Sequence, residues 1–491
     1  MTVPRLRIRT ANHAPVNAEG DFVLYWMTAF RRPYWNFSLQ RAVEHARELK
    51  KPLIVVEALE VGHKWASDRL HHFVIQGMAD NQRAFSKTRV VYYPYLEQEA
   101  GAGNRLLDEL AGRSCLVVTD DFPCFATPGV LPSAAKGLPV QIEAVDSNGL
   151  LPLRATDRVF SRAHDFRRFL QKTLRPHLEE FPLANPLKGC RLPRHPGLDL
   201  NVQERWPAVD VKAIAADPGR LAAVPIDHSV AVTQTRGGWD EARKTLARFC
   251  SKKLPDYESD RNQPERDVTS GLSPFLHCGH VSTHEVFDRL MNDEDWTTEE
   301  LADGASGSAR GWWGTSPALE SFLDELVTWR EIGFNMCWQR DDYDQFDSLP
   351  GWAQKTLHDH EGDIRPSLYS LEEFETGATH DPLWNAAQAQ LLQEGRIHNY
   401  LRMLWGKKIL HWSETPRDAL EIMIQLNNKY AIDGCDPSSY SGIFWVLGRY
   451  DRAWGPEREV FGKVRYMTSE NTARKFRVRN YVKQFSSVEL A

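Results

Sequence analysis

The feature that most constrains the fold is a change in hydrophobic pattern along the chain. The first part contains short apolar runs separated by amphipathic stretches such as LQRAVEHAREL and RLHHFVIQGMADNQRAF. The apolar runs are FVLYWM (22–27), LIVVEAL (53–59), VVYYPY (90–95), CLVVTD (115–120) and QIEAVD (141–146). Buried strands that alternate with helices are typical of a doubly wound parallel sheet. No G-x-G-x-x-G follows the first run, but ligands of such sheets still bind at the carboxyl ends of the strands.

Beyond this part the pattern changes twice. Residues 181–235 are rich in proline and aperiodic, which indicates a linker. After residue 236 helix-period patterns dominate, as in ALESFLDELVTWREIGF, and there is almost no strand signal. We therefore predict an α/β domain over 1–180, a linker over 181–235 and an all-α domain over 236–491. A chain of 491 residues is long enough to bury two cores.

Composition narrows the class of protein. The net charge of -6 gives no overall attraction to nucleic acid, so any basic surface must be local. The seven cysteines form no C-x-x-C pair, which argues for a reducing compartment and against a zinc or iron–sulfur site. The N-terminus lacks an apolar core and no run of about 18 apolar residues occurs, so we expect no signal peptide, no membrane contact and a cytoplasmic location.

Tryptophan is unusually dense in the helical part, where ten of the 16 tryptophans follow residue 300. In EGRIHNYLRMLWGKKILHW (394–412), Trp405 and Trp412 are seven residues apart and share one helix face. Upstream, HDPLWNAAQ adds Trp384 just before another helix. A buried amphipathic helix would explain one such pair, but not its combination with the polar stretch that follows.

That polar stretch is LNNKYAIDGCDPSSYSGIFWVLGRYDRAWG (426–455). A buried Asp433 would need a cation, and Arg402 on the preceding helix is the obvious partner. Asn427 offers both a donor and an acceptor, as the edge of a heteroaromatic ring requires. Asn, Asp and Gly also form ordinary turns, and by itself the stretch would be explained in that way.

A third element is DVTSGLSPFLHCGHVS (267–282), in which Thr269, Ser270 and Ser273 precede an apolar run. Hydroxyls and N–H groups at a helix start suit a phosphate or pyrophosphate. An N-cap would use the same residues, so the motif alone leaves both interpretations open.

In this order the three elements resemble the photolyase/cryptochrome superfamily, and most closely the class II cyclobutane pyrimidine dimer photolyases. The resemblance covers nearly the whole chain and is most specific in TSGLSPFLHCG, DPLWNAAQ, HNYLRMLWGKKILHW, LNNKYAIDG-DPSSYSGIFW and VFGKVRYM. It implies an α/β N-terminal domain and a helical domain that holds FAD. In the family the reduced, anionic flavin absorbs light and passes an electron to a cyclobutane pyrimidine dimer in damaged DNA, which then splits.

The resemblance also implies roles for individual residues. The FAD phosphates would be lined by Tyr257, Ser270, Leu272 and Ser273, with help from Arg330. At the flavin ring, Asn427 would face N5, and Arg402 and Asp433 would form the salt bridge beside it. Trp405 and Trp384 would deliver electrons for photoreduction, with Trp412 and Tyr369 at side or terminal positions.

The dimer pocket would be formed by Glu325, Trp329, Met403 and Trp445. Glu325 and Trp329 are four residues apart and so face one way on a helix. A lesion that is taken out of the duplex needs aromatic walls, a soft contact and a carboxyl for the base edge. Candidate phosphate contacts lie in local basic clusters, namely Lys407, Lys408, Arg449, Arg452, Lys463, Arg465, Arg474, Lys475, Arg477 and Arg479. The acidic chain as a whole predicts modest, salt-sensitive affinity for undamaged DNA.

Three positions depart from the family pattern: Cys435 replaces an expected Arg, Asn428 a common Asp, and Cys278 the usual Phe of LHFG. The alternatives are a cryptochrome-like blue-light receptor without repair activity, a (6–4) photolyase, which would need histidines in the lesion pocket, and a light-independent FAD oxidoreductase or structural DNA-binding module. An antenna chromophore would be a deazaflavin or a folate, and no motif decides between them or requires one. The family default is a monomer.

Overall fold

The computed structural model describes residues 2–103, 105–124 and 127–486. The chain forms two compact units, each built from several segments of the sequence. The first unit comprises 1–156, 174–246 and 272–295, and the second comprises 157–173, 247–271 and 296–491. The segment boundaries expected from the sequence, 1–180, 181–235 and 236–491, stay a prediction.

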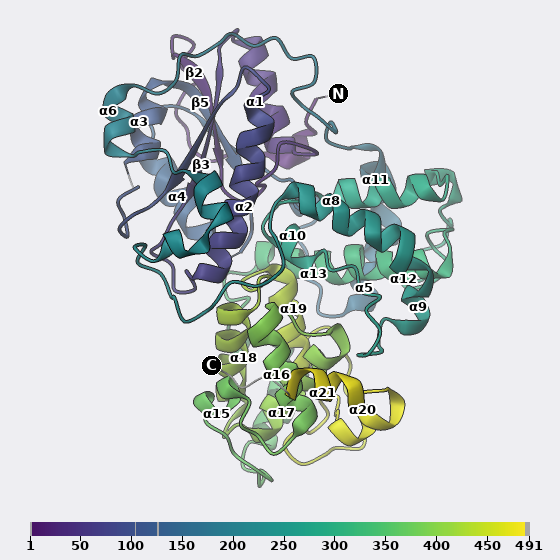
Figure 1. Ribbon diagram of the computed structural model, residues 1–491. Coiled ribbons are helices and arrows are strands. Elements are labelled where there is room, and N and C mark those ends of the chain that lie inside the picture. The colour runs from purple at the N-terminus through teal and green to yellow at the C-terminus, as the bar shows by residue number, and fades with distance from the viewer. Residues whose placement is uncertain (1, 104, 125–126, 487–491) are drawn as a thin grey trace. The chain divides into compact units, whose positions relative to one another are not determined.

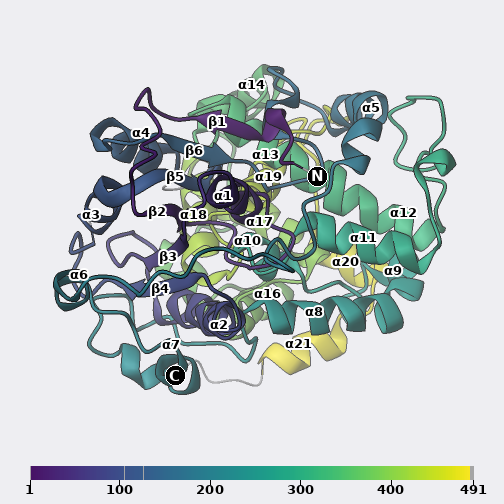
Figure 2. The same cartoon turned by 90° about the horizontal axis from the view of Figure 1, so that it is seen from above.

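The first unit contains the predicted parallel sheet. Its strand order is β1-β6-β5-β2-β3-β4, and Figure 2 shows the strands following one another in this order from above. All neighbouring pairs are parallel except β1 with β6. The strands are β1 (Ile8–Thr10), β2 (Phe22–Met27), β3 (Leu53–Leu59), β4 (Val91–Leu96), β5 (Ser114–Asp120) and β6 (Ile142–Val145).

Helices cover both faces of this sheet. One face, which includes Val23 and Tyr25, packs against α1 (Phe37–Glu48) and α2 (Asp68–Phe85). The other face, which includes Phe22 and Leu24, packs against the remaining helices of this layer (Figure 1). These are α3 (Leu106–Arg113), α4 (Thr127–Gly137) and α6 (Leu200–Arg205). Because successive side chains of a strand point to opposite faces, a strand buried on both sides reads as an unbroken apolar run.

The switch point of the sheet, between β2 and β5, is filled by a side chain of the chain itself. The carboxylate of Asp120 accepts hydrogen bonds from the N–H groups of Thr28, Ala29 and Phe30 at 2.9, 2.8 and 2.8 Å. It also accepts the hydroxyl of Tyr25 at 2.8 Å. Backbone N–H groups at such a turn are where a phosphate would bind in a doubly wound fold. Here the carboxylate of Asp120 takes that place and satisfies these N–H groups.

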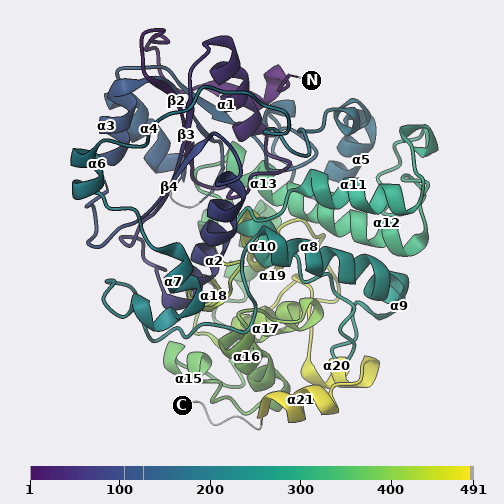
Figure 3. The ribbon, with the colours of Figure 1, turned by 45° about the horizontal axis from the view of Figure 1, so that its top comes forward.

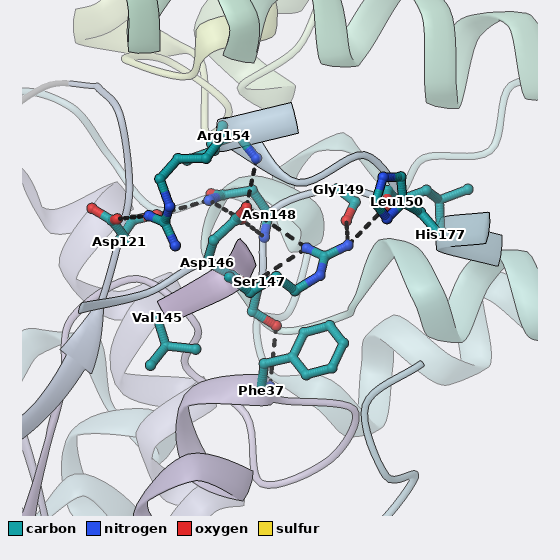
Figure 4. A network of polar contacts seen from close by, with 12 residues as sticks. Phe37, Asp121, Val145, Asp146, Ser147, Asn148, Gly149, Leu150, Arg154 and His177 are labelled. Atoms are coloured by element: carbon teal, nitrogen blue, oxygen red, sulfur yellow. Dashed lines mark hydrogen bonds and ion pairs between the residues drawn. The ribbon is translucent and has the colours of Figure 1, made fainter. Parts of the chain in front are cut away.

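A second polar network holds the loop after β6, in the VDSNGLLPL motif. The guanidinium of the fully buried Arg7 donates to the carbonyl oxygens of Gly149 and Leu150 at 3.2 and 2.8 Å and lies 3.7 Å from the carboxylate of Asp146. Figure 4 shows this network together with Ser147, whose hydroxyl accepts the N–H of Phe37. Because its polar groups are bonded internally, the motif has a structural role in the first unit.

The predicted linker contains short helices that the sequence did not reveal, α6 and α7 (Val211–Ala216). Six residues give less than two turns, too few for a helical period to be visible among the prolines. The first unit also holds α10 (Ser273–His277) and α11 (Thr283–Asp293), and α8 (Trp239–Arg248) runs from the first unit into a segment of the second.

The second unit is helical, as expected, and no β-strand lies in the part of it that the structure describes. Its C-terminal helix α21 lies beside α16 (Figure 3), where the hydroxyl of Tyr481 donates to Gln390 at 2.8 Å. The helices are α5 (Ala163–Thr173), α9 (Tyr257–Asp260), α12 (Pro317–Leu323), α13 (Arg330–Gln339), α14 (Gly351–Asp359), α15 (Leu371–Thr376), α16 (Pro382–Glu394), α17 (Asn399–Trp412), α18 (Pro416–Tyr430), α19 (Pro437–Val446), α20 (Ser469–Lys475) and α21 (Arg479–Ser486). Within the described ranges, none of the helices has the length and apolar character needed to span a bilayer.

Candidate functional site

Three indole rings and a phenol form a continuous row in the second unit. Trp405 on α17 lies parallel to Trp384 on α16, with ring centroids 6.4 Å apart and planes 4° apart. Trp384 meets Trp412 at 6.2 Å, and Trp412 meets Tyr369 at 5.6 Å. The three tryptophans are buried, whereas Tyr369 is half-buried. The row therefore leads from the interior of the unit to its surface.

Hydrogen bonds fix the rings of this row. The indole N–H of Trp384 donates to the carbonyl of Trp405 at 3.0 Å, and that of Trp405 donates to Oε1 of Gln388 at 2.9 Å. Buried Trp side chains usually find such a partner, which holds the ring in one orientation. Gln388 was missed in the sequence analysis, although its spacing of four residues from Trp384 on one helix could have indicated it.

Beside this row lies the predicted ion pair. Nη2 of Arg402, on α17, is 3.0 Å from Oδ1 of Asp433, in the loop after α18. The Asp433 side chain is 9% exposed and the Arg402 side chain 25%. The carboxylate is thus largely buried with a cation as partner, as the polar stretch required.

The amide of Asn427 is buried in the last turn of α18 and has a fixed orientation. Its Nδ2 donates to Oδ1 of Asn428 at 3.1 Å. The same Oδ1 accepts the backbone N–H of Cys435 at 3.0 Å, while Nδ2 of Asn428 donates to the hydroxyl of Tyr440. Two of the departures from the family pattern, Asn428 and Cys435, are therefore joined to each other by a hydrogen bond. Asn427 uses one N–H of its amide in this network, so its side-chain oxygen and second N–H remain to bond a ligand.

The chemistry of these donors and acceptors fits the ring of FAD. Arg402 carries a planar set of N–H donors, Asp433 balances its charge, and Asn427 presents an oriented amide oxygen. A flat heteroaromatic ring with both donors and acceptors on its edge needs this combination.

The residues expected at the FAD phosphates lie on three segments. Tyr257 is buried and packs edge-on against Phe249 and Phe322, and burial raises the pKa of its hydroxyl. Arg330 is buried in α13, with its guanidinium 4.2 Å from the ring centroid of Phe334.

The TSGLS motif crosses from one unit to the other. Ser270 belongs to the second unit, and Leu272 and Ser273 belong to the first. Leu272 is buried and is the N-cap residue of the five-residue helix α10, where its side chain makes no capping bond. The N-cap interpretation of Ser273 is therefore wrong, since this exposed serine is the first residue inside the helix. Gly271 has φ +69°, a conformation that favours glycine.

The residues expected at the lesion are all half-buried: Glu325, Trp329, Met403 and Trp445. Glu325 and Trp329 lie in a π-helical turn, Asp324–Trp329, a local widening that is frequent at functional sites. Glu325 forms an ion pair with Arg261, a residue that the sequence analysis missed. Burial raises the pKa of Glu325, although the guanidinium of Arg261 opposes the shift.

Several candidate phosphate contacts are wrong, because the structure buries them. Lys407 donates to the carbonyl of Val446 at 2.5 Å, and Lys408 lies 3.5 Å from the carboxylate of Asp381. Arg449 is buried and donates to the carbonyl of Tyr343 at 3.0 Å. The remaining candidates are exposed or, for Arg465, half-buried: Arg452, Lys463, Arg465, Arg474, Lys475, Arg477 and Arg479. A helix-period pattern cannot tell a buried lysine from an exposed one when aromatic residues surround it.

Deoxyribodipyrimidine photo-lyase of Methanothermobacter thermautotrophicus is 36% identical to this chain over 477 residues, which cover 97% of each chain. The chain belongs to the photolyase family. The protein of the same name from Arabidopsis thaliana is 32% identical over 99% of this chain and 93% of its own, and that from Potorous tridactylus is 31% identical over 95% and 81%. The resemblance drawn from the sequence is thus confirmed. No protein-family model matches the chain.

A solved structure shows the fold of this photolyase-family chain. The crystal structure of a bacterial class III photolyase from Agrobacterium tumefaciens matches with a TM-score of 0.66 at 19% identity, over 95% of this chain and 86% of that one. The predicted fold class, an α/β parallel-sheet domain followed by a largely helical region, is therefore confirmed. Among the described residues of the chain, no group of three or more His, Cys, Asp or Glu side chains could hold a metal ion.

Proposed function

We propose that this photolyase-family protein binds FAD and uses light to split cyclobutane pyrimidine dimers in DNA. The observation that carries the proposal is the ring row Trp405–Trp384–Trp412, which begins on the helix that also bears Arg402. A light-independent enzyme or a structural DNA-binding protein would not account for such a row. Full-length relatives named deoxyribodipyrimidine photo-lyase support the same reaction.

The flavin ring would be held by Arg402, Asp433 and Asn427, and the phosphates by Tyr257, Ser270, Leu272, Ser273 and Arg330. When bound, FAD supplies light absorption and one-electron transfer. Arg402 and Asp433 would together place a neutral pair of opposite charges beside the ring. The side-chain amide of Asn427 would orient the ring by hydrogen bonding to its edge.

At the lesion, Trp329 and Trp445 would stack on the two flipped pyrimidines and Met403 would fill the space between them. Stacking on an aromatic side chain contributes roughly 1–3 kcal/mol per base. Glu325 would bond a base edge. Arg261, which is paired with this carboxyl, would hold it in place and would add positive charge where negative charge develops on the dimer.

The experiment is repair of an oligonucleotide that contains one cyclobutane dimer, with FAD-loaded, chemically reduced protein under blue light. Product is separated by chromatography, and a (6–4) oligonucleotide serves as the second substrate. We expect the cyclobutane dimer alone to be repaired. Unchanged cyclobutane dimers would refute the proposal and leave the blue-light receptor as the remaining hypothesis. Repair of the (6–4) lesion would indicate a (6–4) photolyase instead.

Two variants separate the roles in the lesion pocket. Glu325→Ala should lower the repair yield per absorbed photon more than the affinity for dimer DNA, and Trp445→Ala should do the reverse. Glu372→Ala, at an exposed position on α15, is the matched control and should change neither. The absorption spectrum of the purified protein would also show whether a deazaflavin or folate antenna is bound.

A further inference from the structure

The outer end of the ring row carries a hydrogen-bonded pair, Tyr369 and His380. The hydroxyl of Tyr369 lies 2.5 Å from Nδ1 of His380. Both rings contact Trp412, with centroid distances of 5.6 Å for Tyr369 and 5.0 Å for His380. The backbone N–H of Tyr369 also donates to the carbonyl of Trp412 at 3.2 Å, which holds the phenol against the indole.

A second hydrogen bond at the tyrosine oxygen bears on the direction of the Tyr369–His380 contact. The backbone N–H of His380 donates to this oxygen at 3.0 Å. With that acceptor position used, donation from the phenol to Nδ1 gives the phenolic hydrogen a partner, and the nitrogen NMR measurement below tests this direction. A neutral imidazole that accepts at Nδ1 carries its proton on Nε2. His380 is exposed, so Nε2 can exchange protons with water.

Hydrogen bonds from the first turn of α16 hold the turn that contains His380. Nδ2 of Asn385 donates to the carbonyl of Thr379 at 2.8 Å, and its Oδ1 accepts the Thr379 hydroxyl at 2.6 Å. Asp381 caps the helix by accepting the N–H groups of Leu383 and Trp384 at 3.0 and 3.1 Å. One helix start therefore positions both Trp384 and His380.

The electrostatics at Trp412 favour passing a positive charge outward. Nζ of Lys408 lies 4.9 Å from the centroid of the Trp412 ring, and Asp381 balances this charge from 3.5 Å. A cation above the ring disfavours a second positive charge on that ring. A tyrosine that loses an electron together with its proton becomes neutral, so it escapes this repulsion.

We propose that His380 is the proton acceptor of Tyr369 in a coupled electron and proton transfer. Oxidised Trp412, a radical cation formed when it gives an electron toward Trp384, takes one electron from Tyr369. The O–H bond of Tyr369 breaks as an N–H bond forms at Nδ1 of His380. The products are neutral Trp412, a neutral tyrosyl radical and an imidazolium. A thiol in solution then returns the electron, and His380 returns the proton. The proposal rests on the proposed light-driven function.

The test compares wild type with His380→Asn, in which an amide oxygen can accept the hydrogen bond but cannot take the proton. After a light flash on the FAD-loaded protein, we expect a tyrosyl radical by electron paramagnetic resonance, formed more slowly in D2O than in H2O. His380→Asn and Tyr369→Phe should both lose this signal. His358→Asn, at an exposed histidine on α14, is the matched control and should keep it. An unchanged radical and isotope effect in His380→Asn would overturn the proposal.

A second measurement needs neither light nor repair. Nitrogen NMR of the histidine side chains in the dark should show His380 protonated on Nε2, with a shift of the Nδ1 signal in Tyr369→Phe. A proton on Nδ1 would overturn the proposal. If the protein takes up no FAD, the proposed function fails by itself, and a ruthenium(III) polypyridyl generated by a flash then serves as the oxidant for the same variants.

Discussion

The first unit, called the sheet unit below, and the second, called the helical unit, treat a buried carboxylate differently. In the sheet unit the carboxylate of Asp120 accepts four hydrogen bonds, all from groups of the chain itself. In the helical unit the carboxylate of Asp433 pairs with the guanidinium of Arg402, whose side chain is 25% exposed. Glu57 repeats the first pattern, since it bonds Arg31, Asn81 and Tyr92 at 3.0, 2.9 and 2.6 Å.

A second buried group of the helical unit, the amine of Lys407, lacks among the described residues the several hydrogen-bond partners that Asp120 and Glu57 have. Lys407 is fully buried, donates to a backbone carbonyl and lies 5.0 Å from the centroid of the Trp445 ring. A buried charge that is fully hydrogen-bonded stabilises one structure, while one with a half-open partner can respond to a ligand. The carboxylates of Asp120 and Glu57 therefore serve the stability of the sheet unit, whereas the Arg402–Asp433 pair of the helical unit is the one available for chemistry.

The largest effect is expected from Asp120→Ala. The substitution leaves the N–H groups of Thr28, Ala29 and Phe30 and the hydroxyl of Tyr25 without their buried acceptor. We expect a loss of about 3–5 kcal/mol in the free energy of unfolding of the sheet unit. Denaturant titration followed by circular dichroism would measure it, with Asp108→Ala at an exposed site of α3 as control. If the free energy of unfolding falls no more than in the control, Asp120 does not stabilise the sheet unit in the way we infer.

Asp433→Ala should act on the ligand more than on the fold. It leaves Arg402 without its carboxylate, but the guanidinium can still reach water, so the cost is smaller than for a fully buried pair. We expect FAD to bind more weakly by about 1–3 kcal/mol, roughly 5- to 150-fold in Kd. Fluorescence titration with FAD measures this change, and Asp359→Ala on the surface of α14 is the control. Unchanged FAD affinity together with a lower free energy of unfolding would mean that Asp433, like Asp120, stabilises the fold.

Lys407→Met should raise stability, and the gain should depend on pH. Burial lowers the pKa of Lys407 to about 7, opposed by Asp451 and assisted by Arg465. Between pH 7 and the ordinary lysine value the unfolded chain holds a proton that the folded chain has lost, so wild type gains stability as the pH rises.

The stability of the Lys407→Met variant does not rise with pH in this way, because methionine does not titrate. Its advantage over wild type should shrink by up to about 1.4 kcal/mol per pH unit between pH 7 and 9. Denaturant titrations of both proteins at several pH values measure the difference. A constant difference would mean that Lys407 stays charged throughout this range.

The smallest expected effect, in free energy, is that of Trp405→Phe on photoreduction of FAD. Phenylalanine is harder to oxidise than tryptophan, and a barrier higher by about 1.4 kcal/mol already costs tenfold in rate. We expect the rate under blue light with a thiol to fall by about tenfold or more, and likewise for Trp384→Phe. Repair by chemically reduced protein should survive. Trp352→Phe, outside the row, is the control, and a wild-type rate in Trp405→Phe would make these tryptophans packing residues.

Much of the fold could be predicted because it follows from local patterns of apolar residues. The runs at 22–27 and 53–59 match β2 and β3 residue for residue, since a strand buried on both faces is an unbroken apolar segment. β1 was missed, because three residues at an antiparallel edge carry no period. The motifs around Arg402, Asn427 and Trp405 could be found because each is compact in sequence.

By itself, then, the sequence determined the α/β-then-helical order, the family, the residue types at the candidate site and the Arg402–Asp433 pair. Only the tertiary structure decided the other partners. It joined Glu325 to Arg261, Trp405 to Gln388 and Tyr369 to His380. It also placed Asp120 in the switch point of the sheet and buried Lys407. The physical reason is that periodicity reports which side of an element faces the core, whereas a hydrogen bond depends on atoms brought together within about 3 Å by the packing of whole elements.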